Sequence, residues 1–232
     1  MGLREYKRKR NFKVTSEPEG KERSAKKRKA LEFVVQKHRA TALHYDVRLE
    51  WNGVMLSWAC PKGPSLDPSV KRMAMQVEDH PIEYNRFEGI IPEGEYGGGT
   101  VMIWDRGTWE PEVEDVDAAL KKGDLKFLLK GEKLKGSWVL VRLRPRGGES
   151  KPAWLLIKHR DAFATTADVA TEKPRSVVSK RILTEIARDE GGDIKKAATG
   201  DPPAELKKLL KSKDPLERKT TGKRKVWNSR PR

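Results

Sequence analysis

The side chains best suited to chemistry alternate along two neighbouring apolar runs. His44, Asp46 and Arg48 alternate in the second run, and alternate residues of a β-strand point to the same face of a sheet. Gln36 and His38 alternate in the same way in the run before it. If the two strands pair, two imidazoles and a carboxylate converge beside a guanidinium and an amide.

This set of side chains suits a divalent transition metal ion. Imidazole favours Mn, Fe, Zn or Cu ions, and a carboxylate adds charge and hardness. Three protein ligands leave positions open for a water and a phosphate oxygen, and Arg48 could hold that phosphate through paired hydrogen bonds. The pattern predicts phosphate-ester hydrolysis, in which cation and guanidinium neutralise transition-state charge. A solvated strand face shows the same alternation, so the residues alone leave both interpretations open.

A second polar cluster follows a later apolar run and contains Glu78, His80 and Tyr84. His80 is a candidate general acid, because the unperturbed pKa of histidine is about 6.5. It could equally cap a turn, and Tyr84 could equally pack in a core. Lys62 and Arg72 lie upstream, at expected loop or strand-edge positions.

The segment that must position these groups predicts many short β-strands. Strands are expected at residues 31–37, 43–51, 54–59, 73–77, 99–104, 107–113, 125–130, 136–142 and 153–158. Turn signals separate them, including the glycine-rich residues 94–99, expected to form a tight hairpin. One helix is expected near residues 115–122. We predict an all-β, mainly antiparallel fold, a compact β-barrel with one or two short helices and flexible basic termini.

Charge divides the sequence into three segments. Lys and Arg outnumber Asp and Glu by 12 to 4 in residues 1–30 and by 18 to 9 in residues 171–232, whereas residues 31–170 hold 20 and 21. We predict a largely flexible basic arm at 1–30, the barrel domain at 31–168, and a basic extension at 169–232, partly helical or disordered. Short helices are expected near 179–188 and 204–211.

Basic arms on a near-neutral body indicate a polyanionic partner, because Lys and Arg contacts to phosphates give sequence-independent affinity for nucleic acid. Solubilising tails would show the same composition. No apolar run approaches the roughly 20 residues of a membrane span, and the first residues lack the apolar segment of a secretory signal. Cys60 is the single cysteine, which excludes an internal disulfide, and we expect it to be a buried thiol at a strand end. A cytoplasmic, nucleoid-associated protein is the resulting hypothesis.

Seven blocks of sequence make a more specific pattern. They are FVVQKH at 33–38, LHYDVRL at 43–49, PKGP at 61–64, VEDHP at 77–81, FEGIIPEGEYG at 87–97, WDRGTW at 104–109 and WLLIK at 154–158. In this order and spacing, residues 33–160 resemble the 3′-phosphoesterase domain of bacterial DNA ligase D. That domain is the end-processing module of bacterial non-homologous end joining.

The resemblance implies a compact β-barrel with a manganese-dependent site. His38, His44 and Asp46 match the metal ligands of the family, and Zn²⁺ or Co²⁺ are alternative ions. Catalytic roles are implied for Arg48, Glu78, His80 and Tyr84. Contacts to the substrate phosphate are implied for Gln36, Arg48, Lys62 and Arg72.

The resemblance also implies a substrate and a pair of reactions. The family acts on the 3′ ends of DNA or DNA/RNA primer-templates whose primer ends in ribonucleotides. It removes the terminal 3′ ribonucleoside, which leaves a 3′-phosphate, and then removes that phosphate to expose a 3′-OH for a DNA ligase. Expected partners are therefore nucleic-acid 3′ ends, DNA ligase and end-joining proteins, with no membrane.

Two features depart from the family pattern. The arm resembles family members, and Glu17 matches a helper acid, but Asn11 stands where an aspartate is expected. The lost carboxylate is expected to weaken the diester step more than the monoester step. The chain also has no room for the ligase and polymerase domains of typical ligase D proteins, so we expect a stand-alone phosphoesterase or that module alone.

Two other functions remain as alternatives. The basic arms would suffice for a non-catalytic nucleic-acid-binding module of end joining, recognisable by salt-sensitive binding without metal uptake. A metal hydrolase of small phosphate compounds would share the same metal and phosphate groups.

Overall fold

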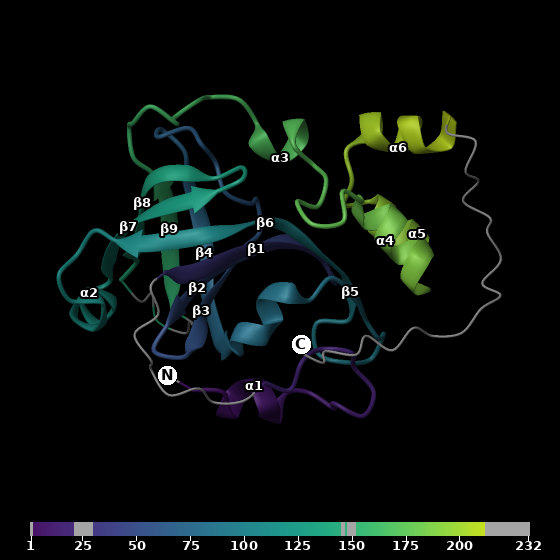
Figure 1. The fold of residues 1–232 in the computed structure, drawn as a ribbon, viewed down its shortest axis with the longest axis horizontal. Helices are drawn as coiled ribbons and strands as arrows, with labels where there is room; N and C mark the ends of the chain where they lie inside the picture. The colour runs from purple at the N-terminus through teal and green to yellow at the C-terminus, as the bar shows by residue number, and fades with distance from the viewer. Residues whose placement is uncertain (1, 21–29, 145–146, 148–151, 212–232) are drawn as a thin grey trace.

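The computed structural model describes residues 2–20, 30–144, 147 and 152–211. Its strands form one antiparallel sheet that curls into a barrel (Figure 1). The strands are β1 (Leu31–Arg39), β2 (Leu43–Trp51), β3 (Val54–Cys60), β4 (Lys71–His80), β5 (Gly89–Ile91), β6 (Gly99–Pro111), β7 (Asp124–Gly131), β8 (Lys135–Arg142) and β9 (Ala153–Lys158). The antiparallel barrel predicted from the strand pattern is thereby confirmed.

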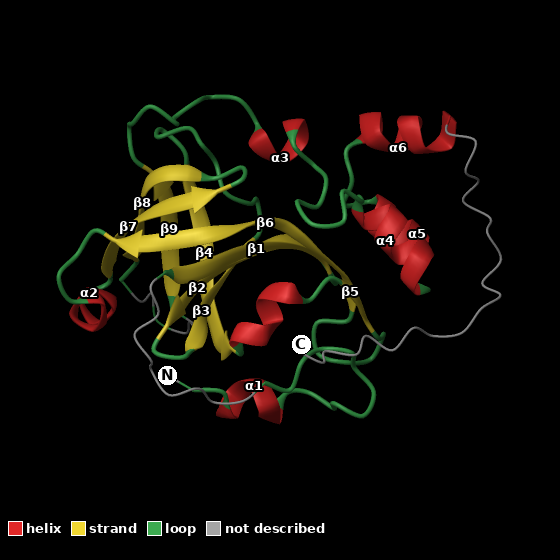
Figure 2. Cartoon of the chain, in the orientation of Figure 1, coloured by secondary structure: helices red, strands yellow, loops and turns green. Residues whose placement is uncertain are grey.

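The helices are short and lie around the barrel (Figure 2). They are α1 (Arg4–Arg8), the 3₁₀-helix η1 (Ile82–Arg86), α2 (Val116–Lys122), α3 (Val169–Glu172), α4 (Leu183–Glu190), α5 (Ile194–Ala198) and α6 (Pro203–Lys211). The expected helix near 115–122 is α2, where Asp115 caps the first turn through the amide of Ala118 and Gly123 ends the helix with a left-handed φ of 86°.

The sheet runs in the order β1-β2-β3-β4-β9-β8-β7-β6-β5, and β1 also pairs with β6. This second pairing closes eight strands into a barrel and leaves β5 attached outside, on β6. Full closure removes exposed strand edges. It also makes β1 a central strand, held by β2 on one side and β6 on the other.

Tryptophans dominate the core of the barrel. The fully buried ones are Trp58, Trp104, Trp109, Trp138 and Trp154. Trp58 and Trp154 meet edge to face with ring centroids 5.9 Å apart, a geometry that adds to their burial. Cys60 is a buried free thiol at the end of β3, as expected.

One predicted boundary differs from the structure for a local reason. The runs at 99–104 and 107–113 belong to the single strand β6. Gly107 lies inside it because β7 passes very close, and a Cβ there would lie 2.2 Å from the carbonyl oxygen of Lys130. This glycine provides for a close backbone approach and not for a turn.

The N-terminal arm differs from the expected flexible segment. Within residues 2–20, Leu3 and Tyr6 are fully buried, and the Tyr6 hydroxyl donates to the carbonyl of Pro18 over 2.6 Å. The arm therefore packs on the barrel despite its charge. The basic run at 26–29 lies outside the described residues.

The described part of the C-terminal extension contains the short helices α3 to α6, joined by loops. The helices expected near 179–188 and 204–211 correspond to α4 and α6, and Gly191 ends α4. Among its described residues, five buried side chains belong to the main core cluster of the barrel: Val169, Leu183, Ile186, Ala187 and Ala197. The extension thus shares the core of the barrel, while residues 212–232 lie outside the described part of the chain.

Within the described ranges, every helix is too short or too polar to span a lipid bilayer.

The packing of the arm predicts a measurable loss of stability. Replacing buried Tyr6 with alanine should lower the free energy of unfolding by about 3 kcal/mol, the usual cost of deleting a buried aromatic ring. Lys7→Ala, on the exposed side of the same helix, should change it by no more than about 0.5 kcal/mol. Urea unfolding monitored by tryptophan fluorescence measures both, and equal small changes would mean that the arm is not docked in solution.

Candidate active site

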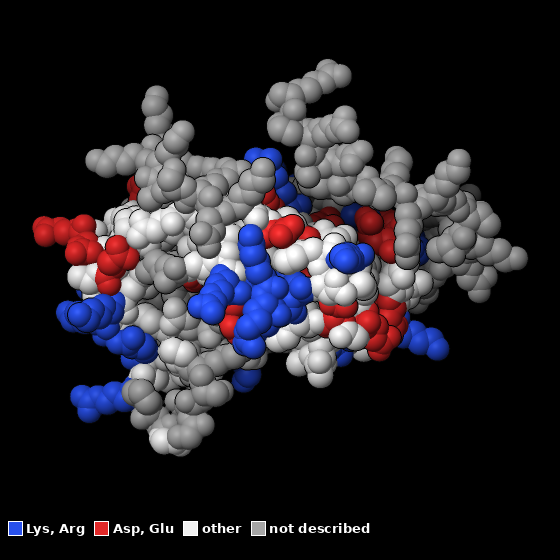
Figure 3. Space-filling model, turned by 90° about the horizontal axis from the view of Figure 1, so that it is seen from below, with Lys and Arg blue, Asp and Glu red and all other residues white. Residues whose placement is uncertain are grey.

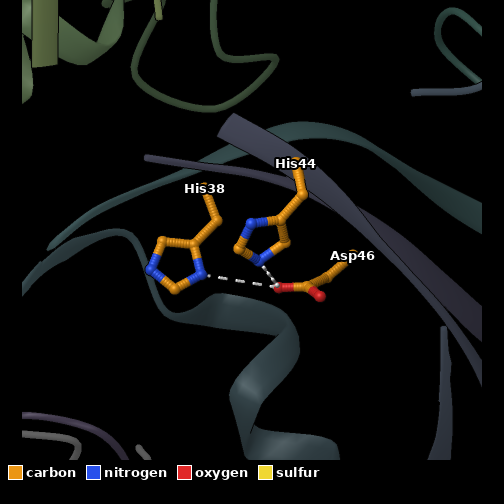
Figure 4. A group of neighbouring side chains, drawn as sticks. All are labelled: His38, His44 and Asp46. Atoms are coloured by element: carbon orange, nitrogen blue, oxygen red, sulfur yellow. Dashed lines mark ion pairs between the residues drawn. The ribbon is translucent and has the colours of Figure 1, made fainter. Parts of the chain in front are cut away.

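The structure brings His38, His44 and Asp46 together on one face of the β1–β2 pair (Figure 4). His38 lies directly opposite His44 in the antiparallel register, and Gln36 lies opposite Asp46. One donor atom from each of the three residues lies within 4.8 Å of the other two. The strand alternation predicted this convergence, since neighbours such as Val47 point the other way, into the core.

The two imidazoles are oriented by the backbone. His38 Nε2 lies 2.8 Å from the carbonyl oxygen of Gly97, and His44 Nδ1 lies 3.0 Å from that of Ala42. A carbonyl only accepts hydrogen bonds, so these nitrogens carry the protons. The lone pairs of His38 Nδ1 and His44 Nε2 then face Asp46, each 3.7 Å from Oδ2.

This donor set fits a transition metal ion. Metal-binding histidines in proteins usually donate their second ring N–H to a carbonyl or carboxylate, which fixes ring orientation and tautomer. Both imidazoles already satisfy that condition. His44 keeps 23% of its side chain exposed, so an ion held here could also contact a ligand from solvent.

Electrostatics keep Asp46 and His44 in the protonation states that a metal requires. Burial alone would raise the pKa of Asp46, but its neighbours, Arg48 foremost, hold this pKa well below its usual range. Burial lowers the pKa of His44, and neighbouring His38 adds to the effect. A carboxylate and a neutral imidazole are the ligand forms.

Arg48 connects the trio to the second polar cluster. Its guanidinium is buried and donates to Asp46 over 3.2 Å, to Gln36 Oε1 over 2.9 Å and to Ser57 over 2.8 Å. It also lies 4.9 Å from the centre of the Tyr84 ring. Arg48 is therefore a fixed positive charge beside Asp46.

His80 lies between two guanidinium groups. Arg48 Nη1 is 2.9 Å from His80 Nδ1, and Arg10 Nη2 is 3.1 Å from Nε2. The carbonyl oxygen of Glu78 lies 2.9 Å from Nδ1. Burial lowers the pKa of His80 well below its ordinary value, and the two arginines lower it further. His80 is therefore neutral here, and the general-acid role expected from its usual pKa requires a nearby anion to raise that pKa.

Tyr84 and Gln36 link this network to η1. The Tyr84 hydroxyl donates to Glu17 over 2.9 Å, and burial together with Glu17 raises the pKa of Tyr84 well above its usual value. It is a neutral phenol that can donate a proton in a hydrogen bond. The Gln36 amide donates to the carbonyl oxygens of Tyr84 and Phe87.

The N-terminal arm completes the network. Arg10 donates to Glu17 over 2.9 Å and to Glu78 over 3.2 Å, and its guanidinium lies 3.9 Å from the ring centre of Tyr6. Lys9 also binds Glu78, over 3.0 Å. Glu78 therefore fastens the arm to β4, and the catalytic role that the resemblance implies for it stays a prediction.

Comparison with known proteins agrees with the geometry. Residues 36–142 match the model of the family described as the DNA Ligase D 3′-phosphoesterase domain. Over 184 residues the chain is 51% identical to the multifunctional non-homologous end joining protein LigD of Pseudomonas aeruginosa, covering 78% of this chain and 22% of that protein.

Two mycobacterial relatives extend this finding. The LigD DNA repair protein of Mycobacterium tuberculosis is 46% identical over 110 residues, which cover 47% of this chain and 14% of that protein. LigD of Mycolicibacterium smegmatis is 38% identical over 164 residues, or 68% of this chain and 21% of that protein. The chain belongs to the DNA ligase D 3′-phosphoesterase domain family. It spans less than a quarter of the length of each of these relatives.

Two of the predicted phosphate-binding residues of this phosphoesterase domain are not joined to the network by the contacts of the described residues. Lys62 is exposed in the turn after β3. Arg72 lies near the start of β4, and its Nε is buried without a hydrogen-bond partner among the described residues. In the described part of the chain, no hydrogen bond or ion pair joins either residue to the trio, and their proposed contacts to phosphate remain predictions.

Sequence reasoning missed two contributors to the site of the phosphoesterase domain. The glycine-rich residues 92–98 connect β5 to β6, and Gly97, with a φ of 81°, supplies the carbonyl that orients His38. Arg10 was assigned to a flexible arm and instead contacts His80. The available signal for the ordered position of Arg10 was Glu17, an acid within a basic segment. A buried acid requires a cation close to it in the fold, and Arg10 is that cation.

The lowered pKa of His80 predicts a pH-dependent stability. The unfolded pKa is about 6.5, so below that pH the unfolded chain takes up a proton that the folded chain does not. As the pH falls below about 6.5, the free energy of unfolding of the metal-free protein should therefore decrease. His80 contributes up to about 1.4 kcal/mol per pH unit to this decrease, until the pH reaches the pKa of His80 in the folded protein.

Urea unfolding in chelator at pH 7.5, 6.5 and 5.5 measures this slope. The His80→Gln variant should show a shallower fall than the wild type. His159→Gln, which alters a partly exposed histidine at the end of β9, should keep the wild-type slope. Equal slopes in wild type and His80→Gln would contradict a buried, neutral His80.

Proposed function

We propose that this chain is a metal-dependent phosphoesterase that processes 3′ ends of DNA or DNA/RNA primer-templates during double-strand break repair. Its activities would be a 3′-ribonucleoside phosphodiesterase and a 3′-phosphomonoesterase. The observation that carries the proposal is the His38–His44–Asp46 trio beside a buried Arg48, within a phosphoesterase domain family.

His38 Nδ1, His44 Nε2 and the Asp46 carboxylate would hold the ion, with Mn²⁺ proposed first and Zn²⁺ or Co²⁺ as alternatives. A divalent cation there would polarise a phosphate oxygen and make a bound water more acidic. Two imidazoles and one carboxylate leave a net positive charge, which favours an anionic ester.

The residues of the chain would act on the bound phosphate. Arg48 lies beside Asp46, so it would neutralise charge on a phosphate held at this site. A phosphate near His80 would offset the two guanidinium charges that now depress its pKa. A protonated His80 could then donate to the leaving oxygen, and the Tyr84 phenol could donate a hydrogen bond.

The surface supports a polyanionic partner. The exposed side of α1 carries Arg4, Lys7 and Arg8, and Figure 3 shows Lys and Arg side chains gathered at this place on the face seen from below. Such a group of cations attracts phosphates at long range and releases counterions on binding. The names of the relatives place them in non-homologous end joining. We extend this role to the present chain, with DNA ligase and end-joining proteins as partners and a cytoplasmic, nucleoid-associated location.

The direct test is incubation with Mn²⁺ and a primer-template that ends in a ribonucleotide or a 3′-phosphate. We expect loss of the terminal nucleoside from the first and release of inorganic phosphate from the second. If neither product forms although metal occupancy is confirmed, the proposal is contradicted. Salt-sensitive DNA binding without metal uptake would favour the binding module, and hydrolysis of small phosphoesters that DNA does not inhibit would favour a small-molecule hydrolase.

The variant His44→Ala should abolish both reactions, because it removes one of three ligands and should lower Mn²⁺ affinity by at least about 100-fold. Its unfolding free energy without metal should stay near that of the wild type, since His44 is partly exposed. His159→Ala is the matched control. Activity retained in His44→Ala at low micromolar Mn²⁺ would exclude His44 as a ligand.

We expect residue 11 to affect the two reactions differently. Asn11 is exposed on the arm, next to Arg10 in the sequence, at a position where the resemblance implies an aspartate. Asn11→Asp should raise the rate of nucleoside removal relative to phosphate release, because a carboxylate is restored for the diester step. Rates on the two substrates measure the ratio, and Asn11→Ser is the neutral control. An unchanged ratio would remove Asn11 as the reason for a weak first step.

A further inference from the structure

The α4–α5 cap, defined here as residues 181–201, lies outside the matched family region and contacts sequence neighbours of the metal-binding residues. We propose that this cap positions the metal-binding residues, so that its contacts set the affinity for the metal ion. The inference rests on the proposed function. It assigns a role to residues beyond the segment 36–142 that matches the family.

The first contact reaches β1 at Lys37. Lys37, the residue before His38, is fully buried, and its Nζ lies 3.8 Å from Asp201. Asp201 also accepts hydrogen bonds from the backbone and hydroxyl of Thr184, over 2.8 and 2.7 Å, in the first turn of α4. The cap thus ends on a buried ion pair attached to the strand that carries His38.

A second contact holds the other neighbour of His38. Arg39 Nε donates to the Thr199 hydroxyl over 2.7 Å. Arg39 Nη1 donates to the carbonyl oxygens of Ala40 and Thr41, in the turn that joins β1 to β2. Thr199 therefore fixes the side chain that braces the hairpin between His38 and His44.

A third contact reaches the glycine loop. Lys196 Nζ donates to the carbonyl oxygen of Gly98 over 3.2 Å. The preceding residue, Gly97, supplies the carbonyl that orients the His38 ring. A Cβ on Gly97 would already lie 3.5 Å from His38 Cε1. A shift of this loop would therefore move the carbonyl oxygen that accepts the hydrogen bond from His38.

Packing supports these polar contacts. A Cβ on Gly200 would lie 2.8 Å from Leu183 and 3.2 Å from Leu43, the residue before His44. One on Gly192 would lie 2.5 Å from Ile90 of β5. The cap therefore contacts residues adjacent in the sequence to His38, to His44 and to Gly97, whose carbonyl orients the His38 ring.

These contacts have a predictable consequence. A metal ion binds best to ligands held in its preferred geometry. Removing a group that hydrogen-bonds to a metal ligand typically lowers metal affinity by about 10–100-fold. The cap contacts lie one residue further away, so we expect a smaller loss, on the order of 3–10-fold in Mn²⁺ affinity. Lys196 and Thr199 lie near the surface, so their replacement should leave the barrel folded.

The experiment compares Lys196→Ala/Thr199→Val with Lys195→Ala in the full chain. Lys195 is the exposed neighbour on the same helix and serves as the control for lost charge. Mn²⁺ affinity by calorimetry, the free energy of unfolding in chelator, and the Mn²⁺ concentration for half-maximal phosphatase rate are measured for each. We expect weaker Mn²⁺ binding and a higher half-maximal Mn²⁺ in the double variant alone, with kcat at saturating Mn²⁺ and stability near wild type. Lys196→Arg/Thr199→Ser, which keeps the donor and the hydroxyl, should restore affinity.

The outcomes separate the two proposals. Equal Mn²⁺ affinity in the wild type and the double variant would overturn the role of the cap and leave the proposed function standing. A wild-type chain that takes up no Mn²⁺ would overturn both. If the double variant unfolds, Thr199→Val alone is judged by the same criteria.

Discussion

The buried carboxylate of Asp46 is the interaction on which the site depends. A charged carboxylate in a protein interior is costly unless cations and donors surround it. Here the Arg48 guanidinium donates to the carboxylate and holds the pKa of Asp46 low against the effect of burial. Because the imidazoles are neutral when they bind metal, a cation is the natural complement to the remaining negative charge.

The same constraint explains the second layer of the site. Arg48 beside Asp46 brings positive charge next to His80, and Arg10 adds more from the N-terminal arm. Burial, together with the two guanidinium groups, keeps the His80 imidazole neutral. The guanidinium group of Arg10 requires acids near it, which Glu17 and Glu78 supply. The arm is therefore bound by charge compensation and by its two buried apolar side chains, and it becomes part of the site.

Sequence reasoning reached the parts of the structure that depend on local periodicity. Strand alternation was enough to place Gln36, His38, Asp46 and Arg48 on one face, and the β1–β2 pairing follows from a short turn. It failed where distant segments meet. Nothing near Thr199 in the sequence indicates that it binds Arg39, 160 positions away, and the burial of Tyr6 in a basic arm has no periodic signal. The strand β6 was predicted as two strands, at 99–104 and 107–113, because the close approach of β7 at Gly107 is not encoded locally.

The most direct test of the metal-binding account is a crystal structure of the chain grown with Mn²⁺, with anomalous diffraction collected at the manganese edge. The account predicts one strong anomalous peak bonded to His38 Nδ1, His44 Nε2 and the Asp46 carboxylate, at about 2.0–2.2 Å, with the carbonyls of Gly97 and Ala42 still bound to the opposite ring nitrogens. A fully folded chain whose histidines face Asp46 without a peak between them, or a peak held by other residues, would contradict it.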